Sequence, residues 1–128
     1  MRLILVRHAH AESGHPDELR PLSVRGREEA RALAERLTAE RPELVLASPL
    51  LRARETAAAI AKATGAELRV DERLTPGAAA EDLLSAAAGA AETVVAVGHQ
   101  PDCSEIAAAL GAGEREFAPA GFAVIDVR

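Results

Sequence analysis

Aromatic side chains are almost missing from this chain of 128 residues, which contains two Phe and neither Tyr nor Trp. Proteins that bind single-stranded nucleic acid stack the bases on such rings, so the composition argues against a surface of that kind. The interior has to be built from aliphatic residues instead. The sequence therefore predicts a core of leucine, valine, isoleucine and alanine.

Cysteine and long apolar runs are equally scarce. Cys103 is the only cysteine, which excludes an internal disulfide and a cysteine-rich zinc site. No apolar stretch approaches the length of a membrane-spanning helix, and residues 3–6 are too few for the core of a signal peptide. We therefore expect a cytoplasmic protein without a membrane partner.

The net charge is −5, with 20 acidic and 15 basic residues. A molecule of this sign repels nucleic acid and anionic membranes, so any anion that it binds has to be attracted by local arginines. A hydrophobic share of 48% and a charged share of 27% are ordinary for a globular protein. The length suits one domain covering residues 1–128.

Apolar runs and helical patterns alternate along the chain. The expected strands cover 2–7, 43–48, 66–71, 93–97 and 122–127, and the expected helices cover about 23–40, 49–65, 80–88 and 102–110. This order predicts an α/β fold with a mostly parallel central sheet and helices on both faces.

Polar side chains follow three of the buried-type strands at the point where each strand ends. Arg7 and His8 close the first strand, Ser48 and Arg52 follow the second, and His99 follows the fourth. The carboxyl ends of parallel strands lie along one edge of a sheet, where open α/β proteins bind ligands. Arginine offers paired donors to phosphate oxygens and neutral imidazole is a nucleophile, so this set predicts a phosphoryl site.

Four segments carry a resemblance to a known family. They are L-V-R-H-A (5–9), R-P-L-S-x-x-G (20–26), S-P-L-x-R-A-x-E-T (48–56) and V-G-H-x-P (97–101). In this order they resemble the histidine phosphatase superfamily, which has the phosphoglycerate mutase-like fold. The short length and R-H-A in place of R-H-G look most like the SixA-type phosphohistidine phosphatases.

The resemblance implies a role for each matching residue. It implies that His8 attacks phosphorus and becomes a transient phosphohistidine, while Arg7 and Arg52 hold the phosphate oxygens. His99 matches the second pocket histidine, and we expect it to be protonated. Nearby guanidinium charges are expected to keep His8 neutral. The implied chemistry needs no metal and no cofactor.

Other residues near these motifs are expected to have structural roles or have no assigned role. The proton donor is left unassigned among Glu72, Asp17, Asp102 and His10. We expect Asp17 to support its loop through local hydrogen bonds, and Ser48 to cap the second helix as Ser23 caps the first. Further structural expectations are a buried thiol at Cys103 and a structural side chain at Arg54. The histidines at positions 8, 10 and 15 lack a recognised metal-ligand spacing with carboxylates.

The favoured function is a phosphatase that removes phosphate from histidine on a partner protein. The chain has no length for the inserted caps with which larger relatives recognise metabolites. One alternative is a small-molecule phosphomonoesterase with the same chemistry. Another is a non-catalytic phosphate-binding adaptor. The sequence argues against it because it contains all four of His8, His99, Arg7 and Arg52. The oligomeric state and the pathway stay open.

Overall fold

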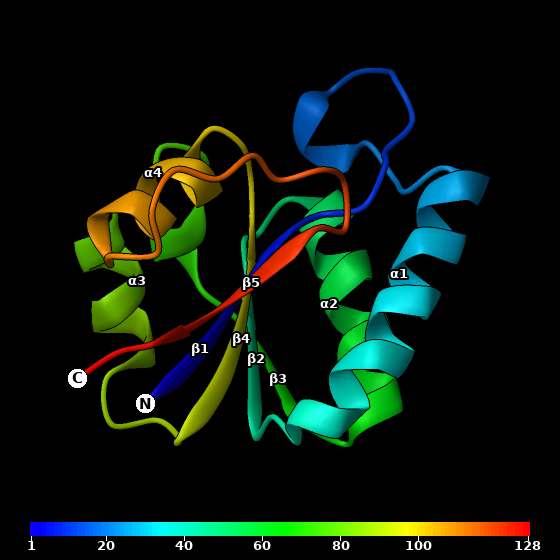
Figure 1. The fold of residues 1–128 in the computed structure, drawn as a ribbon. Coiled ribbons are helices and arrows are strands. Elements are labelled where there is room, and N and C mark those ends of the chain that lie inside the picture. Colours follow the sequence, from blue (N-terminus) through cyan, green and yellow to red (C-terminus); the bar gives the residue numbers. More distant parts are fainter.

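A five-stranded sheet forms the centre of the computed structural model, which describes residues 1–128 (Figure 1). The strands are β1 (Arg2–Arg7), β2 (Leu44–Ala47), β3 (Glu67–Val70), β4 (Thr93–Gly98) and β5 (Phe122–Asp126). Their order across the sheet is β3-β2-β4-β1-β5. All neighbouring pairs run parallel except β1 and β5, which are antiparallel. The predicted α/β class with a mostly parallel sheet is confirmed.

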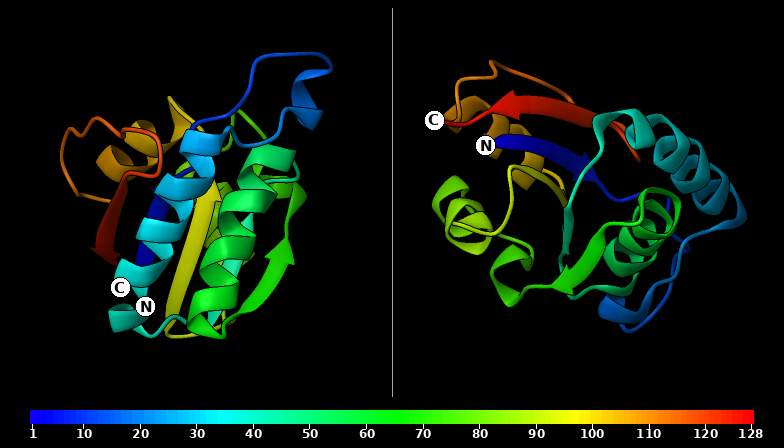
Figure 2. Two further views of the ribbon diagram at one scale, coloured as in Figure 1. Left: turned by 90° about the vertical axis from the view of Figure 1, so that its right-hand side faces the viewer. Right: turned by 90° about the horizontal axis from the view of Figure 1, so that it is seen from below.

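Two helices cover each face of the sheet (Figures 1 and 2). The helices α1 (Val24–Leu37) and α2 (Leu51–Thr64) lie on one side, and α3 (Ala80–Ala87) and α4 (Asp102–Ala109) on the other. Successive residues of a strand point to opposite faces. Leu3 and Leu5 therefore join the cluster under α3 and α4, whereas Ile4 and Val6 join the cluster under α1 and α2. This double burial explains why β1 reads as an uninterrupted apolar run.

Two predicted elements differ in detail from the structure. The first helix ends at Leu37 and continues as a single 3-10 turn, Thr38–Glu40, rather than as α-helix to residue 40. β3 forms where its alternating pattern predicts a strand, yet all four of its residues are exposed. β3 lies at the edge of the sheet, where β2 is its only strand partner.

The segment between β1 and α1 projects above the sheet and carries a 3-10 turn, Asp17–Leu19 (Figure 2). Its base is fixed to the start of α1. Ser23 caps this helix as predicted, because its Oγ accepts from the backbone N–H of Gly26 at 2.9 Å. The backbone N–H of Ser23 donates to the carbonyl of His10 at 3.0 Å. Helix and loop therefore touch through backbone atoms.

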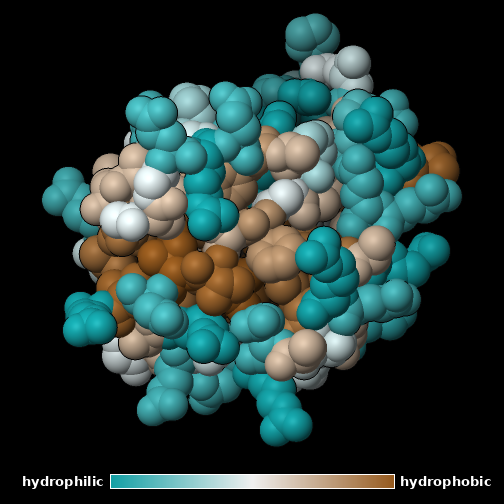
Figure 3. All heavy atoms as spheres, viewed as in Figure 1, coloured by the Kyte–Doolittle hydropathy of each residue, from teal (hydrophilic) through white to brown (hydrophobic).

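Hydrophobic atoms reach the surface along β5 and beside it (Figure 3). Val124, on this edge strand, is 40% exposed, and Met1, Leu110 and Val127 are only partly buried nearby. None of the helices combines the length and the apolar character that a membrane span requires.

Replacing Gly26 by alanine is expected to destabilise the protein. A Cβ at this position would overlap the carbonyl oxygen of His10, and neither atom can rotate away, because one is fixed directly to the helix backbone and the other belongs to the backbone of the loop. The overlap outweighs the gain in helix propensity of about 1 kcal/mol, so we expect a net loss of about 1–3 kcal/mol in urea unfolding. Glu28→Ala, on the exposed face of the same helix, is the control. A Gly26→Ala protein as stable as the wild type would contradict this close approach.

Candidate active site

Backbone pairing at the carboxyl end of the sheet brings three of the chemically important residues to one level. Arg7 of β1 lies opposite Gly98 of β4, and Ala47 of β2 lies opposite Val97. The ladder continues one step past the strands. The N–H of His8 donates to the carbonyl of Gly98 at 3.0 Å, and the N–H of Ser48 donates to that of Val97 at 3.1 Å. His8, Ser48 and His99 therefore leave the sheet side by side.

His8 is held in one tautomer by its own chain. Its Nδ1 lies 2.7 Å from the carbonyl oxygen of Ala9. A carbonyl only accepts, so Nδ1 carries the proton and donates, and Nε2 of the neutral ring keeps its lone pair. Ala9 is itself fixed, because its N–H donates to Thr56 Oγ1 at 3.0 Å and that hydroxyl donates to the carbonyl of Arg52 at 2.8 Å. A lone pair on Nε2 is what a nucleophilic imidazole requires.

Burial is the largest cause that lowers the pKa of His8 to about 4, and the charges of Arg52, Arg7 and Arg20 contribute to the same decrease. The hydrogen bond to Ala9 raises this pKa, but its effect is smaller than that of burial. His8 is therefore neutral at pH 7, as predicted, although desolvation contributes more than the arginines that we expected to be the cause.

Arg7 reaches from the end of β1 to the loop that precedes β5. Its Nη1 donates to the carbonyl of Phe117 at 2.8 Å. Its Nε is buried and has no hydrogen-bond partner. A buried N–H donor without an acceptor is costly, and in an arginine beside a neutral histidine it is typical of a site that receives an anion.

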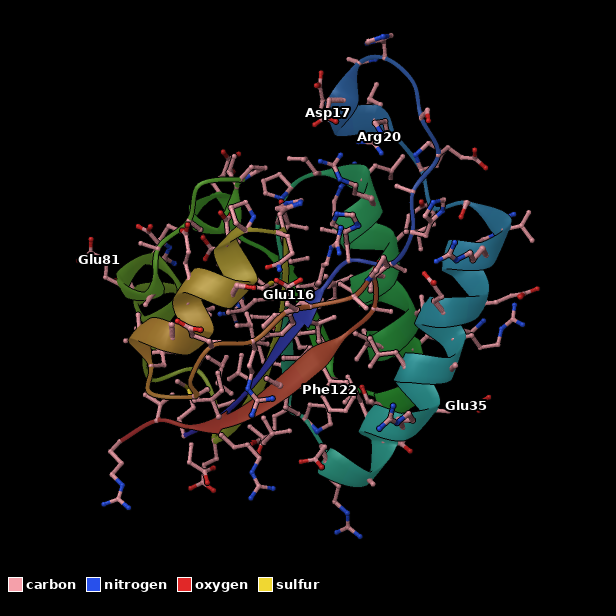
Figure 4. All side chains as sticks on the ribbon, turned by 45° about the horizontal axis from the view of Figure 1, so that its top comes forward. Asp17, Arg20, Glu35, Glu81, Glu116 and Phe122 are labelled. Carbon is pink, nitrogen blue, oxygen red and sulfur yellow. The ribbon has the colours of Figure 1, made fainter.

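Arg52, in the first turn of α2, is only 7% exposed and is already paired. Its Nη1 donates to the backbone carbonyl of Asp17 at 2.9 Å, and its Nη2 lies 3.2 Å from Asp17 Oδ2. The other Asp17 oxygen accepts from Arg20 at 3.0 Å, and Figure 4 shows these two side chains together on the projecting loop. Asp17 therefore supports its loop locally, as predicted, and also ties it to α2, which we did not predict.

The two arginines also decide whether Asp17 can donate a proton. Hydrogen bonds from Arg20 and then Arg52 are the main causes that hold the pKa of Asp17 below its ordinary value. The group is a carboxylate at neutral pH, so it is a poor proton donor. Among the other candidates, Asp102 accepts from the N–H of Gly77 at 2.8 Å, and His10 contacts Ser23 Oγ through Nδ1 at 2.7 Å.

His99 is 4% exposed, and its ring centre lies 5.3 Å from that of His8. Burial, followed by His8 and Arg52, lowers its pKa to about 4. Burial and the neighbouring charges therefore disfavour protonation of His99 in the phosphate-free protein, whereas we expected a protonated ring to stabilise the phosphoryl oxygens. Its Nδ1 is buried without a partner.

Ser48 does not cap the second helix, contrary to our expectation. The cap position of α2 belongs to Leu50, two residues later. Ser48 Oγ lies 2.7 Å from Nε2 of His99 and accepts from the N–H of Leu50 at 3.3 Å. The residue is completely buried. Its hydroxyl thus contacts a pocket histidine in addition to the backbone N–H at the start of the helix.

Two further residues of α2 hold the loops around the pocket, and sequence reasoning assigned neither. Thr56 fixes Ala9, as described above, and Glu55 Oε1 accepts from the N–H of Leu22 at 2.8 Å. Both lie in the segment 48–56 that carries the family resemblance, so the signal was present. Arg54 of the same segment is structural as expected, because its Nε donates to the carbonyl of Pro49 at 2.9 Å.

Cys103 is buried behind the pocket, as predicted, and burial raises the pKa of its thiol to about 12. It is therefore inert as a thiolate nucleophile at neutral pH. A small cavity of about 10 Å³, lined mainly by apolar side chains, separates His99 from α3 and α4. No group of three or more histidine, cysteine or carboxylate side chains lies together in a way that could hold a metal ion.

Comparison with known proteins places this arrangement in a family. The family model of the histidine phosphatase superfamily (branch 1) matches residues 3–76, which include Arg7, His8 and Arg52. A comparison with curated protein sequences gives no match. The chain belongs to the histidine phosphatase superfamily, and it is a phosphohydrolase.

Solved structures narrow the resemblance within that family. A protein from Nakamurella multipartitia, provisionally named phosphohistidine phosphatase SixA, is 30% identical over 96% of this chain and 82% of its own, with a TM-score of 0.83. A provisionally named SixA from Agrobacterium tumefaciens is 30% identical over 98% and 91%, with a TM-score of 0.85. The protein histidine phosphatase SixA in complex with tungstate is 26% identical over 98% and 88%, with a TM-score of 0.86.

The two buried histidines predict how stability depends on pH. Their pKa values fall from about 6.5 in the unfolded chain to about 4 in the folded protein. The unfolded chain therefore binds more protons between these values, and the free energy of unfolding decreases as the pH falls through this window. We expect urea titrations at several pH values to show a shallower decrease for His8→Gln than for the wild type. His15→Gln, which replaces an exposed imidazole, should keep the wild-type slope, and an unchanged slope in His8→Gln would contradict the neutral assignment.

Proposed function

We propose that this protein removes phosphate from phosphohistidine on a partner protein, without a metal, through a phosphohistidine intermediate on His8. The observation that carries the proposal is the hydrogen bond from His8 Nδ1 to the carbonyl of Ala9, in a ring that stays neutral at pH 7. It leaves Nε2 as a free nucleophile among three arginines. The similarity to SixA structures supports the same chemistry.

In the first step His8 Nε2 attacks phosphorus and the bond from phosphorus to the substrate nitrogen breaks. The charges of Arg52 and Arg7 already act on the His8 ring. The unpaired Nε of Arg7 and the unpaired Nδ1 of His99 are available to oxygens that gain charge in the transition state, whereas Arg52 exchanges its bonds to Asp17 for such an oxygen. Positioning and electrostatics then supply most of the catalysis, as is usual in phosphoryl transfer.

In the second step water attacks the phosphorus on His8, which releases inorganic phosphate and restores the free imidazole. The first step leaves the substrate as a histidine ring, which takes up its proton from solvent at the nitrogen that held the phosphate or at the other one. Such a leaving group does not demand a strong carboxylic acid nearby. This agrees with the ionised state of Asp17, the carboxylate that lies against Arg52.

The surroundings of the site favour a substrate presented by a protein. The segment between β1 and α1, whose only regular element is a 3-10 turn, projects above this edge of the sheet (Figure 2). The one cavity that reaches the pocket is too small for a metabolite and contacts His99, not His8. A phosphorylated side chain can therefore approach from solvent.

The covalent intermediate is testable by trapping. After brief incubation with phosphoramidate carrying radioactive phosphorus and a denaturing quench, the wild type should retain label that is labile in acid and stable in base. His8→Asn should retain none, because no nucleophile remains. Arg52→Ala should reduce turnover by about a hundredfold or more, since a charge-assisted contact to the transition state is lost. Arg54→Ala is the matched control and should keep wild-type turnover. Full turnover in His8→Asn would contradict the proposed mechanism.

The substrate class needs a separate comparison. We expect kcat/KM for a histidine-phosphorylated carrier protein to exceed the values for p-nitrophenyl phosphate, glucose 6-phosphate and AMP by at least about tenfold, because the open site contacts little of a small ester. Release of inorganic phosphate measures all four reactions. A preference for one of the esters would favour the small-molecule phosphomonoesterase, and no turnover of any substrate would favour the phosphate-binding adaptor.

A further inference from the structure

Ser48 contacts the pocket only through His99, and its hydrogen bonds restrict the state of that ring. A neutral imidazole has one N–H donor and one lone pair, so two tautomers are possible. Nε2 of His99 lies 2.7 Å from Ser48 Oγ, whereas Nδ1 is buried and has no partner. The tautomer therefore depends on whether the hydroxyl gives or receives a proton in this contact.

If Nε2 carried the proton, the Ser48 oxygen would accept from His99 and also from the N–H of Leu50, 3.3 Å away. The hydroxyl proton would then have no acceptor, because no other hydrogen bond of Ser48 Oγ exists in the structure and the residue is completely buried. Nδ1 of His99 would in addition present a lone pair without a donor. Unpaired buried polar groups of this kind are costly.

If Nδ1 carries the proton, the hydroxyl of Ser48 donates to Nε2 while its oxygen accepts from Leu50. Every polar atom of Ser48 is then satisfied, and the single unpaired group is the N–H at Nδ1 of His99. This group belongs to a ring 5.3 Å from the ring of His8. An N–H attracts a phosphate oxygen, whereas a lone pair in the same place would repel it.

We propose that Ser48 is a positioning residue, which holds His99 in the tautomer with the proton on Nδ1 and so makes the neutral ring a hydrogen-bond donor to the phosphoryl group on His8. This assignment rests on the phosphohydrolase chemistry at His8, but not on the identity of the phosphorylated partner. The role of His99 is then to donate a hydrogen bond without first carrying a charge. That suits a buried ring on which the charge of Arg52 acts, where a further positive charge is unfavourable.

The tautomer can be read directly by long-range proton–nitrogen NMR on protein labelled with nitrogen-15 histidine. The chain has four histidines, so the signals of His99 are identified by their loss in His99→Gln. At neutral pH and without phosphate, we expect a protonated Nδ1 and an unprotonated Nε2. A protonated Nε2 in the wild type would overturn the proposal, whatever substrate the protein acts on.

Variants of Ser48 separate positioning from a merely structural role. Ser48→Ala should move His99 toward the tautomer with the proton on Nε2 and lower kcat/KM by about tenfold, the effect of one hydrogen bond. Ser48→Thr keeps the hydroxyl and should restore the wild-type tautomer. Ser104→Ala is the matched control, because its hydroxyl contacts Gln100 and the carbonyl of Arg115 but no histidine.

Each outcome decides the matter. The proposal would be overturned if Ser48→Ala kept both the wild-type tautomer and the wild-type kcat/KM. It would also be overturned if Ser104→Ala changed the tautomer of His99 and Ser48→Ala did not. If Ser48→Ala does not fold, the wild-type spectrum still gives the answer. A protein that fails on phosphohistidine substrates but shows the expected tautomer would contradict the proposed substrate and leave the role of Ser48 intact, with kcat/KM measured on whichever phosphorylated compound the wild type hydrolyses.

Discussion

The parallel hydrogen-bond ladder that joins β1 and β2 to β4 is the constraint on which the pocket depends. It aligns Arg7 with Gly98 and Ala47 with Val97, so the residues that follow each strand emerge at one level. Because the side chains of a strand alternate between faces, a shift of one residue in this register would turn His8 or His99 away from the other. The buried leucines and valines of both core clusters thus determine the geometry of the polar residues at this edge.

Several arginine charges act on His8, although the molecule has a net charge of −5. Burial contributes more than the arginines to the low pKa values of His8 and His99, and it leaves donors on Arg7 and His99 without partners. A site of this kind is organised before any ligand arrives. Little reorganisation is then needed when charge develops on a phosphoryl group, which is the condition for strong electrostatic catalysis.

Much of this arrangement could be predicted from the sequence, because it depends on patterns that are local. The apolar runs predicted the strands. The polar residues that follow the strand ends pointed to Arg7, His8 and His99 as site residues. The role of Ser48 was missed because a serine before a helix is usually its cap, and only the fold shows that His99 lies beside it. The low pKa of His99 in the phosphate-free protein was not foreseen, because its burial and the charges near it come from chain segments that are distant in sequence. The contact of Asp17 with Arg52 spans 35 positions and has no local signature.

That contact also bears on how firmly the protein can hold a free anion. When the site is empty, the Arg52 guanidinium already has a carboxylate and a backbone carbonyl as partners. In the proposed reaction, a phosphate oxygen that reaches Arg52 exchanges one acceptor for another, and the free energy gained is only the difference between the two. Such an exchange limits affinity for inorganic phosphate far more than it limits the transition state, whose charge is greater and better aligned. The loop carboxylate in this way favours departure of the product over its retention.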